Sequence, residues 1–214
     1  MAALDKVHSE ALARFKKAEE YEREDRLLQE EDLAFLAGEQ WSETIKNERE
    51  NTDRPVLTFN RLPQFIEQVV GDARQNKPAI KVHPVDEGSD PDTAEIHEGL
   101  IRNIEAQSRA TEAYITALGH ACGGGKGAWR VLTEYVSDDS FAQDIKVKRI
   151  VNPFAVYWDP GAVEYSKQDA NWCFVVEWIT KEAFEAKWPD KTPKEWENTF
   201  RRFGSVEHWL SNGS

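Results

Sequence analysis

Residues 54–82 read RPVLTFNRLPQFIEQVVGDARQNKPAIKV, and this stretch decides the fold expected for the first half of the chain. Asn60 is a favourable cap for a helix, and Pro63 is tolerated in a first turn. The apolar residues that follow recur at three- and four-residue intervals, which places them on one face of an amphipathic helix: Leu62, Phe65, Ile66, Val69 and Val70. The helix is predicted to end near Asn76, because Lys77 precedes a proline.

The segments on either side of this helix carry weaker patterns. Residues 39–59 are predicted to be irregular, with a turn at Asp53-Arg54-Pro55 and an extended piece over residues 56–59. After the helix, residues 80–85 predict a short strand because apolar side chains recur there, and residues 86–91, DEGSDP, predict a loop.

Two longer helices are predicted around this region. Residues 3–36 have apolar side chains at helical spacing, and Gly38 is a plausible stop. The charge-rich surface of this helix fits either a solvated arm packed along one stripe or a dedicated contact between subunits. A third helix is expected to begin at Pro91 behind Asp90 as its cap, and to run to about Gly119.

The pattern changes from helical to alternating after residue 127. Residues 129–134 and 141–150 predict a β-hairpin, because apolar and polar side chains alternate in both and a polar loop joins them. Residues 155–158 and 172–179 predict two more strands. Short helices are expected over residues 181–187 and 193–203. Helices followed by a mostly antiparallel sheet and then by short helices indicate an α+β fold.

Composition limits the functions open to the chain. Its 214 residues carry a formal net charge of −12, which argues against a sequence-independent DNA-binding surface built from clustered Lys and Arg. The longest apolar runs are far shorter than the roughly 20 residues that span a bilayer. The first residues lack the order of a secretory signal, so we expect the protein to be intracellular when made. Cys122 and Cys173 are predicted to be buried, reduced thiols.

The sequence contains weak candidates for chemistry. Residues 123–127, GGGKG, invite a phosphate-loop interpretation, but Gly127 replaces the required hydroxyl residue and His120 stands where the first glycine should be. A helix-to-strand connection is the better interpretation, since glycine relieves backbone limits at such a corner. His120 and Cys122 are close in sequence, yet residues two apart at a helix end rarely form a catalytic pair.

The remaining histidines and carboxylates show no ligand spacing. The histidines considered for metal binding are His8, His83, His97 and His208. The loop carboxylates considered for a cation are Asp138, Asp139 and Asp159. Aspartate is common in turns for structural reasons, so we assign no catalytic, cofactor-binding or metal-binding residue and expect no cofactor.

Three segments together resemble a known family. The first comprises Trp41, RPVLTFNRLP at residues 54–63, and the continuation to residue 82. The second comprises GKGAW at residues 125–129, Phe141, Ile145 and RIVNP at residues 149–153. The third comprises VYWDP at residues 156–160 and DANWCF at residues 169–174. In this order they resemble the N-terminal part of the portal protein of short-tailed phages, over roughly residues 30–190.

The resemblance implies a structural protein and no enzyme. It implies a ring of identical subunits, a dodecamer in the full-length family, at one capsid vertex. DNA is packaged and ejected through this head-to-tail connector. Capsid, terminase and tail factors would be its partners, with ATP hydrolysis left to the terminase, and no membrane or sequence-specific nucleic acid would be bound. It would be found in the virion, and in the host cytoplasm during assembly of the phage or prophage.

The resemblance also implies an organisation. Residues 1–38 would form an N-terminal helical arm, and residues 39–214 an incomplete wing-like α+β region. Family chains are several times longer, so a truncated gene product or an excised domain is expected, without the channel-lining helices. Such a piece should expose an apolar edge where other polypeptide packs. The alternatives are a free-standing interaction module with a portal-like fold and an enzyme of unrecognised type.

Overall fold

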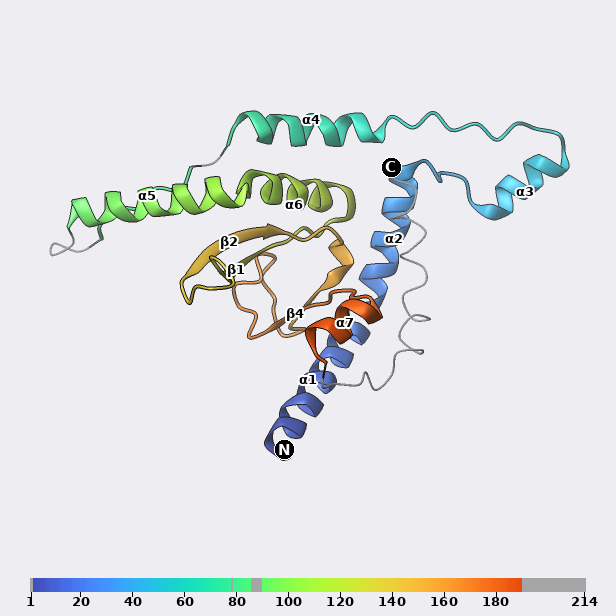
Figure 1. Cartoon of the computed structure of the whole chain (residues 1–214). Coiled ribbons are helices and arrows are strands. Elements are labelled where there is room, and N and C mark those ends of the chain that lie inside the picture. The colour runs from blue at the N-terminus through green and yellow to red at the C-terminus, as the bar shows by residue number, and fades with distance from the viewer. Residues whose placement is uncertain (1, 78, 86–89, 190–214) are drawn as a thin grey trace. The chain divides into compact units, whose positions relative to one another are not determined.

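The computed structural model describes residues 2–77, 79–85 and 90–189, in which helices are followed by two small antiparallel sheets and a last helix (Figure 1). This order confirms the predicted α+β class. The chain divides into two units, Met1–Val175 and Val176–Ser214. Within the described residues, no helix is both long and apolar enough to cross a lipid bilayer.

The long helix predicted over residues 3–36 is present as two consecutive helices, α1 (Ala2–Tyr21) and α2 (Arg23–Ala37). Backbone hydrogen bonds still run through the junction at Glu22, whose amide donates to the Ala18 carbonyl at 2.9 Å. Gly38 ends α2 in the left-handed conformation with φ of 109°, as predicted for the stop.

The prediction that residues 39–59 are wholly irregular is wrong, because α3 (Glu43–Asn51) lies among them. The helix carries a single large apolar residue, Ile45, so it shows no apolar periodicity for sequence reasoning to detect. The turn at Asp53 is confirmed, and the following stretch runs without regular structure to α4 (Leu62–Gln75).

The amphipathic helix is confirmed as α4, with Pro63 in its first turn and Asn76 at its end. The Asn60 side chain accepts a hydrogen bond from the Leu62 amide at 3.2 Å, although Arg61 occupies the cap position itself. The strand predicted over residues 80–85 is absent. This segment has no partner strand in the described part of the chain, so its backbone groups have no ladder to join.

The helix predicted from Pro91 to Gly119 is broken in two. The cap at Asp90 is confirmed, because its side chain accepts a hydrogen bond from the Asp92 amide. However, α5 (Pro91–Ser108) ends before Arg109, which has a left-handed φ of 52°, and α6 (Ala110–Gly124) then runs five residues beyond the expected end. No glycine or proline marks the break in the sequence.

The predicted hairpin is confirmed as β1 (Trp129–Tyr135) and β2 (Gln143–Arg149), antiparallel from the pair Trp129 and Arg149 to the pair Tyr135 and Gln143. A small core lies where α6 rests on this hairpin, with Ala110 and Ala113 packed against Val147. Helix α4 contacts α6 in turn.

A second antiparallel pair joins β3 (Val156–Trp158) to β4 (Cys173–Val175). Both strands are shorter than the alternating pattern suggests, and they form their own sheet instead of extending the hairpin. Phe15 of α1 packs edge-on against Tyr157 and Phe174, with ring centroids 4.8 and 5.7 Å away. This aromatic group attaches the small sheet to α1.

The second unit contains α7 (Lys181–Lys187), which confirms the predicted short helix. Thr180 caps α7 by accepting a hydrogen bond from the Ala183 amide. The helix predicted over residues 193–203 lies outside the described residues.

Candidate functional site

The glycine-rich segment at residues 123–127 closes α6 and turns the chain into β1. Gly125 takes a left-handed φ of 78° at the end of the helix. A Cβ on Gly127 would lie 1.8 Å from the carbonyl oxygen of Ala117, so only glycine fits there. The predicted helix-to-strand connection is confirmed, and its order is opposite to the strand-to-helix order of a phosphate loop.

The first two glycines of this segment let α6 approach α2 closely. A Cβ on Gly124 would lie 2.9 Å from side-chain atoms of Gln29, and one on Gly123 would lie 3.2 Å from Leu36. Gln29 is buried in this contact. The run of glycines is therefore explained by packing at a helix–helix contact and a sharp corner.

The lysine of the glycine-rich segment contacts carboxylates of α2 and its N-terminal cap. The Lys126 Nζ lies 3.8 Å from an oxygen of Glu22 and 3.7 Å from one of Asp25. The side chain that would hold a phosphate in a phosphate loop instead ties the corner to the helix pair.

Glu22 and Arg26 form a buried ion pair that fastens the helices to β3, and we call it the Glu22–Arg26 latch. Arg26 Nη2 lies 2.8 Å from Glu22 Oε2, and the Glu22 side chain is only 6% exposed. The guanidinium also donates to the carbonyl oxygens of Phe154 at 2.8 Å and Val156 at 2.5 Å. Such a pair is stable only when further hydrogen bonds satisfy both ions, as they do here.

Two further contacts complete the latch. Glu22 Oε1 accepts a hydrogen bond from the Trp158 amide at 3.2 Å. The Arg26 guanidinium lies 3.7 Å from the centre of the Tyr157 ring, a cation–π distance. Burial raises the pKa of Tyr157, and the charge of Arg26 beside it opposes that rise. The hydrogen bonds from this pair to residues 154, 156 and 158 join positions more than 120 residues apart in the sequence.

His120 and Cys122 lie near the end of α6, and the His120 Nδ1 makes no hydrogen bond to the Cys122 thiol. Burial lowers the pKa of His120, and its Nδ1 is buried without a hydrogen-bond partner. The prediction of buried cysteines is wrong, because Cys122 and Cys173 are both exposed, free thiols. In β4 the partly buried face belongs to Phe174, which packs on α1, so Cys173 points to the opposite side.

The other candidate residues remain apart. His8, His83 and His97 are exposed, and His208 lies outside the described residues. Among the residues that the structure describes, no three histidine, cysteine or acidic side chains are grouped to hold a metal ion. Asp138 and Asp139 are exposed in the β1–β2 turn.

Asp159 and a second aspartate organise the loop that follows β3. Asp159 accepts hydrogen bonds from the Gly161 amide at 3.0 Å and from Asn171, and these bonds lower its pKa. Asp169 accepts from the Val163 amide at 2.6 Å, which likewise lowers its pKa. These carboxylates act as turn residues, since their oxygens are occupied by the loop's own backbone.

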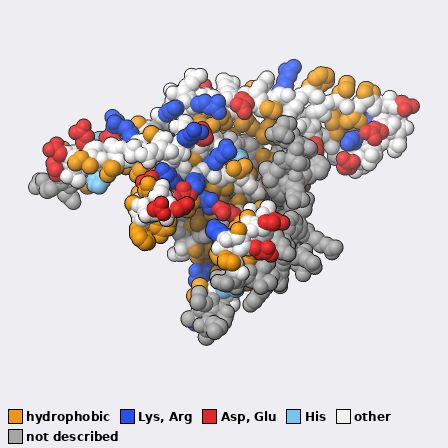
Figure 2. All heavy atoms as spheres, viewed as in Figure 1, with side chains coloured by type: hydrophobic (Ala, Val, Ile, Leu, Met, Phe, Trp, Pro, Cys, Tyr) orange, Lys and Arg blue, Asp and Glu red, His pale blue; other side chains and the backbone are white. Residues whose placement is uncertain are grey.

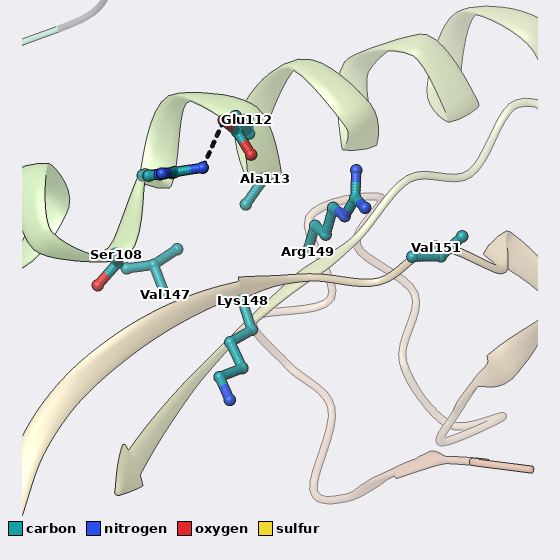
Figure 3. A pocket seen from close by; sticks show the side chains of 8 residues that line it. Ser108, Glu112, Ala113, Val147, Lys148, Arg149 and Val151 are labelled. Carbon is teal, nitrogen blue, oxygen red and sulfur yellow. Dashed lines mark ion pairs between the residues drawn. The ribbon is translucent and has the colours of Figure 1, made fainter. Parts of the chain in front are cut away.

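One hollow of about 280 Å³ lies between the α5–α6 junction and β2. In Figure 3, Val147 and Arg149 point toward α6, whereas Lys148 points to the opposite side of the strand. Glu112 is the one carboxylate in its lining and pairs with Arg109 at 4.0 Å. No histidine, cysteine or second carboxylate lines the hollow, so it offers no acid–base pair.

A second hollow, of about 270 Å³, lies where the chain leaves α2 and passes α3. Trp41 lines it and donates from Nε1 to the Leu57 carbonyl at 3.1 Å. Arg49 donates to the Pro55 carbonyl and lies 4.9 Å from the centre of the Trp41 ring. These contacts hold the irregular stretch before α4 in place.

Many large hydrophobic side chains are exposed to solvent. Among the residues that the structure describes, no large side chain is fully buried. Figure 2 shows such side chains gathered along the stretch that joins α3 to α4. In and after this stretch the exposed residues are Leu57, Phe59, Leu62, Phe65 and Val69. The structure thus exposes apolar side chains where the sequence analysis expects an apolar edge.

Residues 12–212 match the sequence model of the phage P22-like portal protein family. The chain belongs to this family. A relative called "Portal protein", from Acyrthosiphon pisum secondary endosymbiont phage 1, is 26% identical over 198 residues. The match covers 86% of this chain and 27% of the relative, so the chain spans about a quarter of the curated relative's length.

In this portal-family chain, each of the three segments that carry the resemblance corresponds to particular elements of the fold. The first runs from Trp41 through the irregular stretch into α4. The second comprises the glycine corner and the β1–β2 hairpin. The third forms β3, its loop and β4.

Sequence reasoning missed the buried Glu22 and its ion-pair partner Arg26. They lie in YEREDR at residues 21–26, where the apolar pattern thins. Their four-residue spacing was the available signal, because Glu and Arg so placed meet on a helix surface. Nothing in the sequence indicated that β3 would cover the pair.

Proposed function

We propose that this chain forms the outer, wing-like part of a portal subunit. Such subunits form the ring through which phage DNA enters and leaves the capsid. Family membership over residues 12–212 carries the proposal. The uncovered apolar surface supports it, because a wing within a ring has neighbours on several sides.

The proposal divides the chain by role. Residues 1–38 form a helical arm, and residues 39–214 form an incomplete wing. Capsid, terminase and tail factors are contacted by the assembled ring, in the virion and in the host cytoplasm before it. The proposal assigns no catalytic, cofactor-binding or metal-binding residue, and ATP hydrolysis belongs to the terminase.

Purified particles of the phage that encodes the chain test this proposal. We expect its peptides in the virion by mass spectrometry, and antibody against β1–β2 to label one vertex of each particle in electron microscopy. A nonsense mutation should yield capsids without DNA, and a plasmid copy should restore filled heads.

Two other results would replace the proposal with an alternative function. If the chain is abundant in infected cells but absent from particles, it is a free-standing interaction module. If calorimetry detects tight, stoichiometric binding of a nucleotide or a metal ion, it is an enzyme.

A further inference from the structure

One stripe along α1 and α2 consists of exposed apolar side chains with acidic side chains on both sides. Tyr21, Leu28 and Phe35 recur every seven residues, which places them on one side of the two consecutive helices. Their side chains are 66%, 59% and 48% exposed. Four carboxylates lie three or four positions from Leu28 and so border it on both sides: Glu24, Asp25, Glu31 and Asp32. We call these seven residues the acidic stripe.

The segment from Arg54 to Phe65 has the opposite charge. It contains Arg54 and Arg61 but no aspartate or glutamate. Both arginines are exposed and make no ion pair with the residues that the structure describes. Phe59 is 82% exposed and Phe65 59% exposed. We call residues 54–65 the basic segment.

The two surfaces are neighbours in one chain but do not cover each other. The Asn60 side chain donates to the Leu36 carbonyl at 2.6 Å, so the basic segment is fastened beside the end of α2. Even so, the apolar side chains of both surfaces stay open to solvent. Each surface therefore lacks an apolar partner of opposite charge within its own described chain.

We propose that the acidic stripe of one copy binds the basic segment of a second copy. Apolar side chains would form the centre of the contact and the arginine–carboxylate pairs its rim, the usual anatomy of a protein interface. Opposite charge on the two rims steers the copies together and disfavours like-to-like pairing. This contact rests on the proposed portal role, because it identifies the surfaces through which subunits meet.

The contact joins two different surfaces, and each copy carries one of each. Such a head-to-tail interface leaves a free acidic stripe at one end and a free basic segment at the other. Further copies add in the same way, and the series closes into a ring when the rotation per subunit permits.

Charge-swap variants of the 214-residue chain test the contact by sedimentation velocity over a dilution series. The stripe variant carries Glu24→Lys, Glu31→Lys and Asp32→Lys, so that three lysines outweigh the one remaining carboxylate. The segment variant carries Arg54→Glu and Arg61→Glu. Asp25 is left unchanged because it contacts Lys126. Each variant alone now opposes like charges, so its self-association should weaken by at least about tenfold relative to the unaltered chain.

An equal mixture of the two variants should associate again, because the altered stripe is basic and the altered segment acidic. The matched control carries Glu95→Lys and Arg74→Glu, exposed charges outside both surfaces, and should associate like the unaltered chain. Circular dichroism checks that all variants are folded.

The inference is overturned by any of three results: an unaltered chain that stays monomeric throughout, single variants that associate normally, or a mixture that does not recover. Any of these would leave the virion test of the portal role untouched. If peptides of the chain are found in particles but the purified chain is monomeric, the two surfaces contact other proteins of the particle and not a second copy.

Discussion

The backbone of Gly127 packs against α6 so closely that a Cβ would lie 1.8 Å from the Ala117 carbonyl oxygen. Gly127→Ala should therefore lower the free energy of unfolding by about 3 kcal/mol, because backbone must move to make room. Urea denaturation followed by circular dichroism measures this change.

Gly119→Ala is the matched control, because Gly119 lies on α6, the helix against which Gly127 packs. A Cβ there would meet nothing within 4 Å, and alanine favours helix, so stability should rise by about 0.5–1 kcal/mol. Equal effects from the two substitutions would contradict the packing explanation of the glycine-rich corner.

Burial lowers the pKa of His120 from its ordinary value of 6.5, so the unfolded chain binds its proton more readily than the folded chain does. This contribution to stability is complete above pH 6.5 and is lost as the pH falls from there through the folded pKa. His120→Leu should flatten the fall in stability over that window.

Urea titrations above and below pH 6.5 measure the effect of His120→Leu. The exposed His97 on α5 provides the control, and His97→Leu should keep the pH dependence of the unaltered chain. A His120→Leu variant that is as pH-sensitive as the unaltered chain would refute a role for His120.

At the scale of elements, the Glu22–Arg26 latch holds the α1–α2 junction to β3. Arg26→Met removes the donor to the Phe154 and Val156 carbonyls and leaves the buried Glu22 with Lys126, 3.8 Å away, as its remaining cation. Losing one member of a buried pair costs about 3–5 kcal/mol, so a loss near that range is expected in thermal or urea unfolding.

Two further variants separate the effect of burial on the stability of the Glu22–Arg26 pair from the effect of its charges. Arg14 and Glu10 have the same spacing on α1 but are about half exposed, so Arg14→Met should change stability by less than about 1 kcal/mol. The double variant Glu22→Leu with Arg26→Met should be more stable than Arg26→Met, because it removes a buried carboxylate that has lost its nearest cation. A double variant less stable than Arg26→Met would show that Glu22 acts chiefly through the Trp158 amide and Lys126.

Elements with a local signal could be predicted from the sequence, and elements set by tertiary contact could not. Helix α4 has a cap, a proline and an apolar face in one short stretch, and the β1–β2 hairpin alternates cleanly. In contrast, the break at Arg109 lacks any glycine or proline, and α3 has almost no apolar residues. The break accompanies the docking of Ala110 and Ala113 on Val147, a contact between distant residues.

The candidate site was predictable to the same extent. The sequence could exclude a phosphate loop at residues 123–127, since the pattern fails locally. The contacts of Lys126 with Glu22 and Asp25 depend on how α6 meets α2, and the exposure of Cys173 depends on which face of β4 meets α1. Such facts follow from packing between segments, which a single sequence does not display.

At the scale of the whole molecule, local order coexists with uncovered apolar surface. The latch and the loop after β3 satisfy their own polar groups, and the glycine corner packs closely against α2. Large side chains from α2, the irregular stretch and α4 nevertheless remain exposed. The chain spans about a quarter of the curated relative's length, and under the proposed portal role neighbouring polypeptide would cover that surface.

The net charge of −12 predicts how the chain behaves toward duplex DNA. A phosphate backbone is held by clustered Lys and Arg that displace its counterions, whereas an acidic surface repels it. The 214-residue chain should therefore show no binding of duplex DNA at physiological salt. Fluorescence anisotropy of a labelled duplex, titrated with the chain at several salt concentrations, measures this. A basic DNA-binding domain in the same assay provides the positive control. Binding that weakens steeply with salt would reveal a phosphate-contacting surface and would contradict the expected electrostatic repulsion.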